Sequence, residues 1–215
     1  MKGFFITGTD TDVGKTWFML KFGELLIENN IKFHYLKPVE SGCEIINNQP
    51  TPNDALQFSK LENVSLDKIC KYKFKAYASP PKAAQLENRE IELKNIIKFI
   101  ESNKLTNSKH YNLIEGCGGF FSPIAKGKLS SDLAVELNLP VILVVKNILG
   151  CINHTLMSLK SIENLNLKTQ FIVLNDTKEN TILDNYQELS SFTNIPIIKL
   201  GYNKKIKPVI LNYLK

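Results

Sequence analysis

Residues 7–16 read TGTDTDVGKT, and their types and spacing are those of a loop that binds phosphate. Gly8 and Gly14 let the backbone fold around an anion, so that successive N–H groups point at phosphate oxygens. Lys15 supplies positive charge for the outer phosphates, and the Thr16 hydroxyl is a ligand suited to Mg²⁺. Five residues separate the two glycines, one more than in the common G-x-x-x-x-G-K-S/T motif. An apolar run precedes the loop, so the order of strand, loop and helix is the order that phosphate binding requires.

Three other residues have chemistry that fits phosphoryl transfer. Lys37 follows a predicted strand and precedes Pro38, which stiffens the turn. A second lysine beside the phosphate loop would stabilise charge on a transferring phosphoryl group, although a surface lysine is the alternative. Asp54 and Glu115 offer the hard oxygens that Mg²⁺ prefers. Asp54 alone is equally typical of a helix N-cap, whereas Glu115 stands between a predicted strand and a glycine-rich turn.

The elements that must position these residues alternate along the chain. Strands are predicted at residues 2–7, 33–36, 111–114, 140–145, 170–174 and 195–200. Helices are predicted at residues 15–29, from Asp54, at 93–102, from about 151 to 165, near 182–192 and at 207–214. Residues 40–53 are expected to form a polar loop, and residues 65–77 are ambiguous between helix and strand.

This alternation predicts one α/β domain over residues 1–215, a P-loop NTPase-like parallel sheet with helices on both faces. In such sheets, ligands bind beyond the carboxyl ends of the strands. Five polar groups follow predicted strands: the phosphate loop, Lys37, Glu115 with its glycines, residues 150–153, and Asn175 with Asp176. We therefore expect them on one rim.

Composition narrows the function classes. The net charge is +6, but Arg89 is the only arginine and the lysines are dispersed, which disfavours nucleic-acid binding. The four cysteines do not have metal-clip spacing, so neither a zinc site nor a redox pair is indicated. The longest apolar runs fall short of the ~18 residues that a membrane helix needs. We expect a cytoplasmic protein without a signal peptide, because Lys2 leads directly into the phosphate-loop strand.

Several motifs together resemble the dethiobiotin synthetase family, in the family's order and over residues 2 to about 200. They are GTDTDVGKT at 8–16, KPVESG at 37–42, Asp54-Ala55, EGCGG at 115–119 and LGCINH at 149–154. The resemblance implies an ATP- and Mg²⁺-dependent ligase of biotin synthesis. Such an enzyme converts 7,8-diaminononanoate and CO₂ to dethiobiotin, with ADP and phosphate as the other products.

The resemblance also implies roles for particular residues. Lys15 and Lys37 would hold the γ-phosphate and a carbamate, and Thr16, Asp54 and Glu115 would bind Mg²⁺. Asn175 would recognise the adenine edge. The implied ATP contacts are Thr11, Asp12, Val13, Gly14, Lys15, Thr16, Trp17, Asp54, Glu115, Gly116, Cys117, Gly118, Asn175 and Asp176. The implied substrate contacts are Thr11, Lys37, Ser41, Gly118, Gly150, Cys151, Asn153 and Tyr186.

A homodimer follows from the same resemblance. Residues 150–153 begin a predicted helix, whose free N–H groups suit a carboxylate. In the family, this segment receives the substrate's carboxylate tail from the neighbouring subunit. Tyr186 matches a family tyrosine near that tail if one residue is deleted before it.

The chain also departs from the family pattern. Asp12 stands where many members have Glu, Cys117 replaces a small residue and is expected to crowd its loop, and the segment after residue 200 is short. Two alternative functions remain: a corrinoid amide synthase, and an ATPase switch of the partition or division kind. The switch proteins carry an extra lysine early in the phosphate loop, where this chain has Thr9, Asp10 and Thr11.

Overall fold

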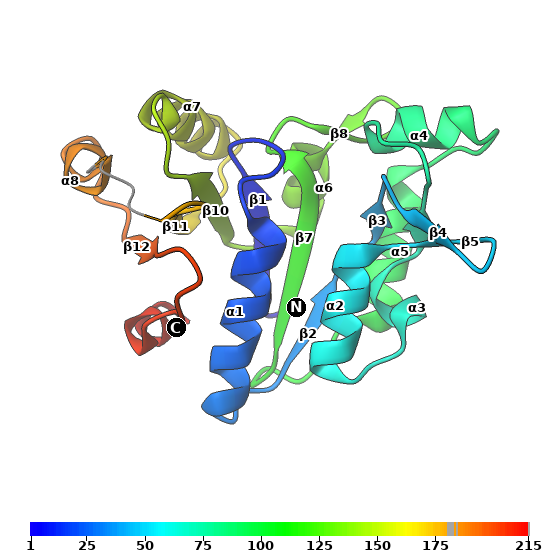
Figure 1. The fold of residues 1–215 in the computed structure, drawn as a ribbon, viewed down its shortest axis with the longest axis horizontal. Coiled ribbons are helices and arrows are strands. Elements are labelled where there is room, and N and C mark those ends of the chain that lie inside the picture. Colours follow the sequence, from blue (N-terminus) through cyan, green and yellow to red (C-terminus); the bar gives the residue numbers. More distant parts are fainter. Residues whose placement is uncertain (180–182, 184, 215) are drawn as a thin grey trace.

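A six-stranded parallel sheet forms the centre of the computed structural model, which describes residues 1–179, 183 and 185–214 (Figure 1). The strand order is β12-β11-β10-β1-β7-β2, and every neighbouring pair is parallel. The strands are β1 (Gly3–Gly8), β2 (Phe33–Leu36), β7 (Tyr111–Gly119), β10 (Val141–Lys146), β11 (Thr169–Asn175) and β12 (Ile197–Leu200). The predicted parallel sheet is therefore confirmed.

Helices cover both faces of this sheet. Alternate side chains of each strand point to opposite faces, and the apolar side chains on each face are buried by helices. In β1, Phe4 and Ile6 pack in one cluster with side chains of α1, whereas Phe5 packs in a second cluster on the other side. The helices are α1 (Lys15–Glu28), α2 (Asn53–Glu62), α3 (Leu66–Ile69), α4 (Pro80–Leu86), α5 (Leu93–Asn103), α6 (Ser130–Leu137), α7 (Cys151–Asn164) and α8 (Asn185–Ser190).

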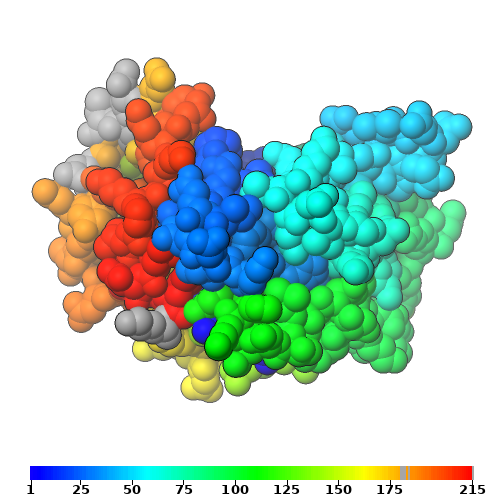
Figure 2. Space-filling view, turned by 90° about the horizontal axis from the view of Figure 1, so that it is seen from below, coloured from blue at the N-terminus to red at the C-terminus, as the bar shows by residue number. Residues whose placement is uncertain are grey.

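The C-terminal segment packs against α1. Ile210 and Leu214 belong to the same buried cluster as Phe18 and Phe22 of that helix. Figure 2 shows this segment lying beside α1 on the surface seen from below. The predicted terminal helix is a 3-10 helix, Pro208–Tyr213. Of the predicted helix near 182–192, α8 is observed, and residues 182 and 184 lie outside the described residues.

Several short elements correct the sequence prediction. The expected polar loop at 40–53 contains an antiparallel hairpin of β4 (Glu44–Ile46) and β5 (Gln49–Thr51). Its two-residue turn is made by Asn47 and Asn48, both at positive φ (52° and 59°), as tight hairpins require. The ambiguous segment 65–77 divides into α3 and β6 (Tyr72–Lys73), and β6 pairs with β3 (Val39–Glu40). The prediction also missed α4, α6 and the hairpin of β8 (Pro123–Ala125) and β9 (Lys128–Leu129).

Candidate active site

The phosphate loop connects β1 to α1 and has the backbone conformation that its sequence predicts. Asp12 and Gly14 both have positive φ, 54° and 92°. A Cβ atom on Gly14 would lie 2.1 Å from Asn175 Nδ2, so only glycine fits there. No described side chain caps α1, and its first N–H groups therefore stay available to an anion.

Asn175 is attached to this loop from the end of β11. Its Nδ2 donates a hydrogen bond of 2.9 Å to the Val13 carbonyl. The Oδ1 atom is buried and has no partner in the described part of the chain. An unsatisfied buried acceptor is costly, so this atom is suited to accept a hydrogen bond from a bound group.

Lys15 is buried and folds back over its own loop. Its Nζ donates to the Asp10 carbonyl at 3.1 Å. Burial lowers the pKa of Lys15 below its ordinary value, although the negative charge of Glu115 acts in the opposite direction. A bound phosphate would offer this ammonium group the charged acceptor that the loop itself lacks.

Lys37 is also buried, but its surroundings have the opposite effect on its pKa. Its Nζ forms ion pairs with Asp54 and with Glu115, the latter at 2.8 Å. Burial alone would lower the pKa of Lys37, but the two carboxylates outweigh burial and raise it well above its ordinary value. Lys37 is therefore a fixed cation at the centre of the site and not a surface lysine.

The three predicted metal ligands lie around this ammonium group. Thr16 Oγ1 donates to the two carboxylate oxygens of Glu115 at 3.1 and 3.2 Å. Burial would raise the pKa of Asp54, but the charge of Lys37 outweighs it and the pKa is lowered. Hydroxyl and carboxylate oxygens are a donor set that fits Mg²⁺. The described residues contain no group of three or more His, Cys, Asp or Glu side chains that could hold a metal. An ion here would therefore also need water and phosphate oxygens as ligands.

Glu40 is a site residue to which the sequence analysis assigned no role. Its two carboxylate oxygens accept hydrogen bonds from the N–H groups of Asp54 and Ala55, each at 3.0 Å. Glu40 thus accepts the hydrogen bonds of the free N–H groups at the start of α2. The Asp54 side chain is therefore available for its ion pair with Lys37. The alternative that Asp54 is the helix N-cap is wrong, because Pro52 occupies that position. Glu40 lies 14 residues before Asp54, so no local capping pattern could have revealed the contact.

These side chains surround a cavity of about 520 Å³. Its expected lining residues are Thr11, Asp12, Gly14, Lys15, Thr16, Lys37, Ser41, Asp54, Glu115, Gly116, Cys117 and Gly118. Val39, Glu40, Gly42, Asn53 and Tyr77 line it as well. The Cys117 thiol lies 3.5 Å from the Val39 carbonyl of β3. Most of the polar groups predicted for the rim therefore converge here.

The family model described as AAA domain matches residues 2–208. The ATP-dependent dethiobiotin synthetase of Vesicomyosocius okutanii is 37% identical over 208 residues, 94% of this chain and 91% of the relative. The one from Clostridium botulinum is 37% identical over 95% of this chain and 93% of the relative. The one from Legionella pneumophila is 31% identical, and the match covers 100% of both chains.

The chain belongs to the ATP-dependent dethiobiotin synthetase family. Solved structures add a likeness of fold. MinD of Aquifex aeolicus has a TM-score of 0.53 at 14% identity, and the match covers 100% of this chain and 86% of the MinD chain. A plasmid partition protein of Borrelia burgdorferi has a TM-score of 0.51 at 16% identity, with coverages of 99% and 95%. At such low identity they support the P-loop NTPase-like fold alone.

The other residues implied by the synthetase resemblance do not line this cavity. They are Val13, Trp17, Gly150, Cys151, Asn153, Asn175, Asp176 and Tyr186. Val13 and Asn175 still adjoin it through Gly14. Asp176 accepts a hydrogen bond of 2.6 Å from Asn147, whose own Oδ1 accepts one of 2.7 Å from Asn185. This amide network was not predicted.

The residues at the start of α7 do not line the cavity that contains Lys37. Gly150 has φ 88° and precedes the helix, and the Cys151 side chain is buried in the core. Asn153 is exposed. Tyr186 is half-buried among the side chains between α7 and α8, and Lys199 Nζ lies 4.8 Å from its ring centroid. Within one chain, these residues are not brought together with Lys37.

Proposed function

We propose that the whole chain, residues 1–215, acts as a single ATP-binding domain that makes dethiobiotin. It is an ATP-dependent cyclo-ligase: 7,8-diaminononanoate, CO₂ and ATP give dethiobiotin, ADP and phosphate. The observation that carries the proposal is the pair of buried lysines, Lys15 and Lys37, in one cavity with Thr16, Asp54 and Glu115. Two cations facing one anion-binding loop suit a reaction whose intermediates are all anionic.

The first step needs no nucleophile from the protein. An amine of the substrate attacks the carbon of CO₂ through its nitrogen lone pair, and loss of a proton leaves a carbamate. The cavity agrees with this, because burial raises the pKa of the Cys117 thiol to about 11 and keeps it protonated. The Ser41 hydroxyl donates to the Ala78 carbonyl at 2.7 Å, which leaves its lone pairs free to accept an N–H of the substrate.

The second step transfers the γ-phosphoryl group. A carbamate oxygen attacks the γ-phosphorus, and the bond from that phosphorus to the bridging oxygen of ADP breaks. Lys15 stabilises the phosphate charge from the loop side, and Lys37 holds the carbamate from the end of β2. The second amine then attacks the carbonyl carbon of the mixed anhydride, the bond from that carbon to the phosphate oxygen breaks, and the ureido ring closes as the nitrogen loses a proton to water. The protein contributes position and charge at each step.

Mg²⁺ is part of the proposal. The Thr16 hydroxyl and the carboxylates of Asp54 and Glu115 would hold it, and it would supply positive charge against the phosphate oxygens of ATP. The buried Oδ1 of Asn175 lacks a hydrogen-bond donor, and it would accept a hydrogen bond from the exocyclic amine of adenine. The Asp176 carboxylate accepts a hydrogen bond from Asn147, so it would help to position the adenine base only indirectly.

A homodimer completes the proposed site. Gly150 and Asn153 lie outside the cavity of their own chain, so they would meet the substrate's carboxylate tail only across an interface. Exposed apolar side chains near the start of α7 support that interface: Leu149 is 87% exposed and Met157 62%. We propose that the protein is cytoplasmic and binds no nucleic acid. No described helix is long and apolar enough to cross a membrane.

Dethiobiotin formation tests the proposal. Purified protein is incubated with 7,8-diaminononanoate, bicarbonate and MgATP, and dethiobiotin is measured by mass spectrometry. We expect product in the complete mixture and none when ATP is replaced by a non-hydrolysable analogue. Absence of product with correctly folded protein would reject the proposed activity.

A further inference from the structure

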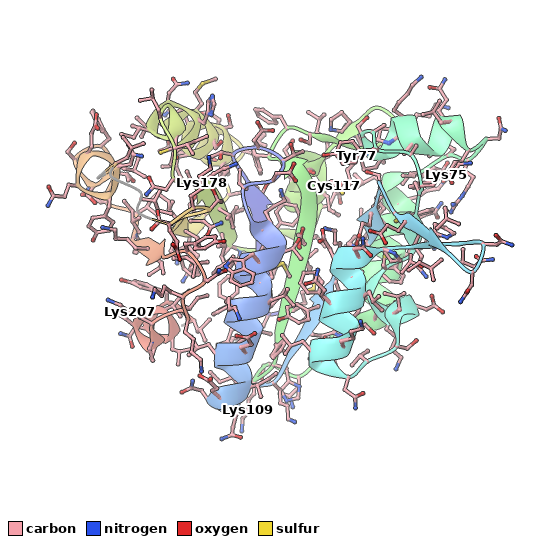
Figure 3. All side chains as sticks on the ribbon, viewed as in Figure 1. Lys75, Tyr77, Lys109, Cys117, Lys178 and Lys207 are labelled. Carbon is pink, nitrogen blue, oxygen red and sulfur yellow. The ribbon has the colours of Figure 1, made fainter. Side chains whose placement is uncertain are left out.

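Tyr77 is an aromatic residue that its own chain scarcely covers. Its side chain is 87% exposed, whereas Tyr35 is fully buried and Tyr111 is 8% exposed. Yet Tyr77 lines the active-site cavity, together with Lys37 and Ser41. Cys117 is another lining residue, and Figure 3 shows both residues labelled beside the carboxyl end of β7. A large apolar ring is therefore left uncovered at the wall of a polar cavity.

The backbone on both sides of Tyr77 is held to the loop that carries Ser41. The Gly42 N–H donates to the Ala76 carbonyl at 3.0 Å, and the Ser41 hydroxyl donates to the Ala78 carbonyl at 2.7 Å. The backbone at Tyr77 is thus held on both sides, which places the start of its side chain next to Ser41 and Gly42.

The Tyr77 ring also restricts position 42 to glycine. Gly42 has φ 74°, and a Cβ atom there would lie 2.8 Å from Cδ2 of Tyr77. The missing side chain at Gly42 leaves room for the aromatic ring against the loop. Tyr77, Gly42 and Ser41 therefore form one continuous section of the cavity wall.

This section lies on the substrate side of the proposed site. Ser41 and Lys37 belong to the same cavity wall, whereas Asn175 approaches the phosphate loop from β11 and is not among the lining residues. The diamine has a long methylene chain between its two amines and its carboxylate. That chain must leave the charged centre, and an exposed aromatic ring beside the centre gives it an apolar surface.

We propose that Tyr77 is a substrate-binding residue whose ring covers the methylene chain of the diamine and so selects long-chain diamines over short ones. The inference rests on the proposed function, and it adds to that function a residue that determines substrate specificity. The contact is apolar, so the ring is needed and its hydroxyl is not.

The test compares Tyr77→Ala and Tyr77→Phe with the unaltered protein. We expect Tyr77→Ala to raise the KM for 7,8-diaminononanoate roughly tenfold, the effect of losing a hydrophobic contact to a substrate. The KM for ATP should stay unchanged, and Tyr77→Phe should behave like the unaltered protein. Phe192→Ala is the matched control, because Phe192 is 59% exposed but does not line this cavity.

A diamine with three fewer methylenes gives a second readout, as a substrate or as a competitive inhibitor. Tyr77→Ala should lower the preference for the longer chain. A normal diamine KM in Tyr77→Ala would overturn the inference, as would a raised KM for ATP, which would place the ring on the nucleotide. If the unaltered protein makes dethiobiotin and Tyr77→Ala matches it, only this inference fails. If the unaltered protein makes none, the proposed function fails and the inference fails with it.

Discussion

Lys37 Nζ lies 2.8 Å from Glu115 Oε1, and the register of the sheet brings the two side chains together. Leu36 of β2 pairs with Ile114 of β7, so Lys37, which directly follows β2, lies beside Glu115, the next residue of β7. Both side chains are buried, with 8% of Lys37 and 1% of Glu115 exposed. The central ion pair of the site is thus a consequence of strand order and pairing.

The first prediction is that Lys37→Ala and Lys15→Ala each lower kcat a hundredfold or more. Each change removes a positive charge from the transfer site, a loss of roughly 3 kcal/mol or more in transition-state stabilisation. Steady-state kinetics measure the effect, and circular dichroism checks that each variant is folded. Lys126→Ala is the control, because Lys126 is exposed and pairs with Glu90. Near-normal turnover in Lys37→Ala would remove this lysine from the mechanism.

A second prediction concerns Asp54. Asp54→Asn keeps the size of the side chain but removes its charge, so the Mg²⁺ concentration needed for half-maximal activity should rise about tenfold or more. Asp67→Asn is a suitable control, because Asp67 is exposed and pairs with Lys73 away from the cavity. The measurement is a Mg²⁺ titration at saturating ATP. An unchanged titration curve would show that Asp54 serves only to hold Lys37.

A third prediction tests the shared site by subunit mixing. Lys37→Ala damages the chemical centre, and Asn153→Asp places a negative charge where the substrate's tail would bind. In a mixed dimer, one of the two sites would combine an intact Lys37 with an intact α7 start from the other chain. Equal mixing should therefore restore roughly a quarter of the unaltered activity. If residues 150–153 act within their own chain, or if the active species is a monomer, mixing should restore nothing.

A fourth prediction concerns the thiol in the cavity. Burial raises the pKa of Cys117 to about 11, although the nearby charge of Lys37 acts in the opposite direction. Its thiolate fraction at pH 7 should then be roughly 100-fold below that of a cysteine with the ordinary pKa of 9.0. We expect slow alkylation at pH 7 that accelerates about tenfold for each pH unit up to pH 10, and protection by ATP. Peptide mapping by mass spectrometry follows each site, and fast modification of Cys117 at pH 7 would contradict the account.

Much of the fold was predictable because its signals are local. Buried apolar strands such as Val141–Lys146 give continuous hydrophobic runs, and the glycines, lysine and threonine at 8–16 are adjacent in sequence. Lys37 and Glu115 could be placed on one rim because parallel strands share an edge. The contact of Glu40 with α2 and the amide network of Asn147, Asp176 and Asn185 could not, because they depend on how separate elements dock. The role of Asp54 as an ion-pair partner and not an N-cap also depends on that docking.

In the proposed reaction, ATP turnover depends on a carbamate that only the substrates supply. The most direct test is phosphate release, measured with the complete mixture and with diamine, bicarbonate or Mg²⁺ omitted in turn. We expect little phosphate from ATP alone and release in step with dethiobiotin when all components are present, because the phosphoryl acceptor is otherwise missing. Unchanged release without the diamine, or stimulation by DNA but not by diamine and bicarbonate, would contradict it and favour an ATPase switch.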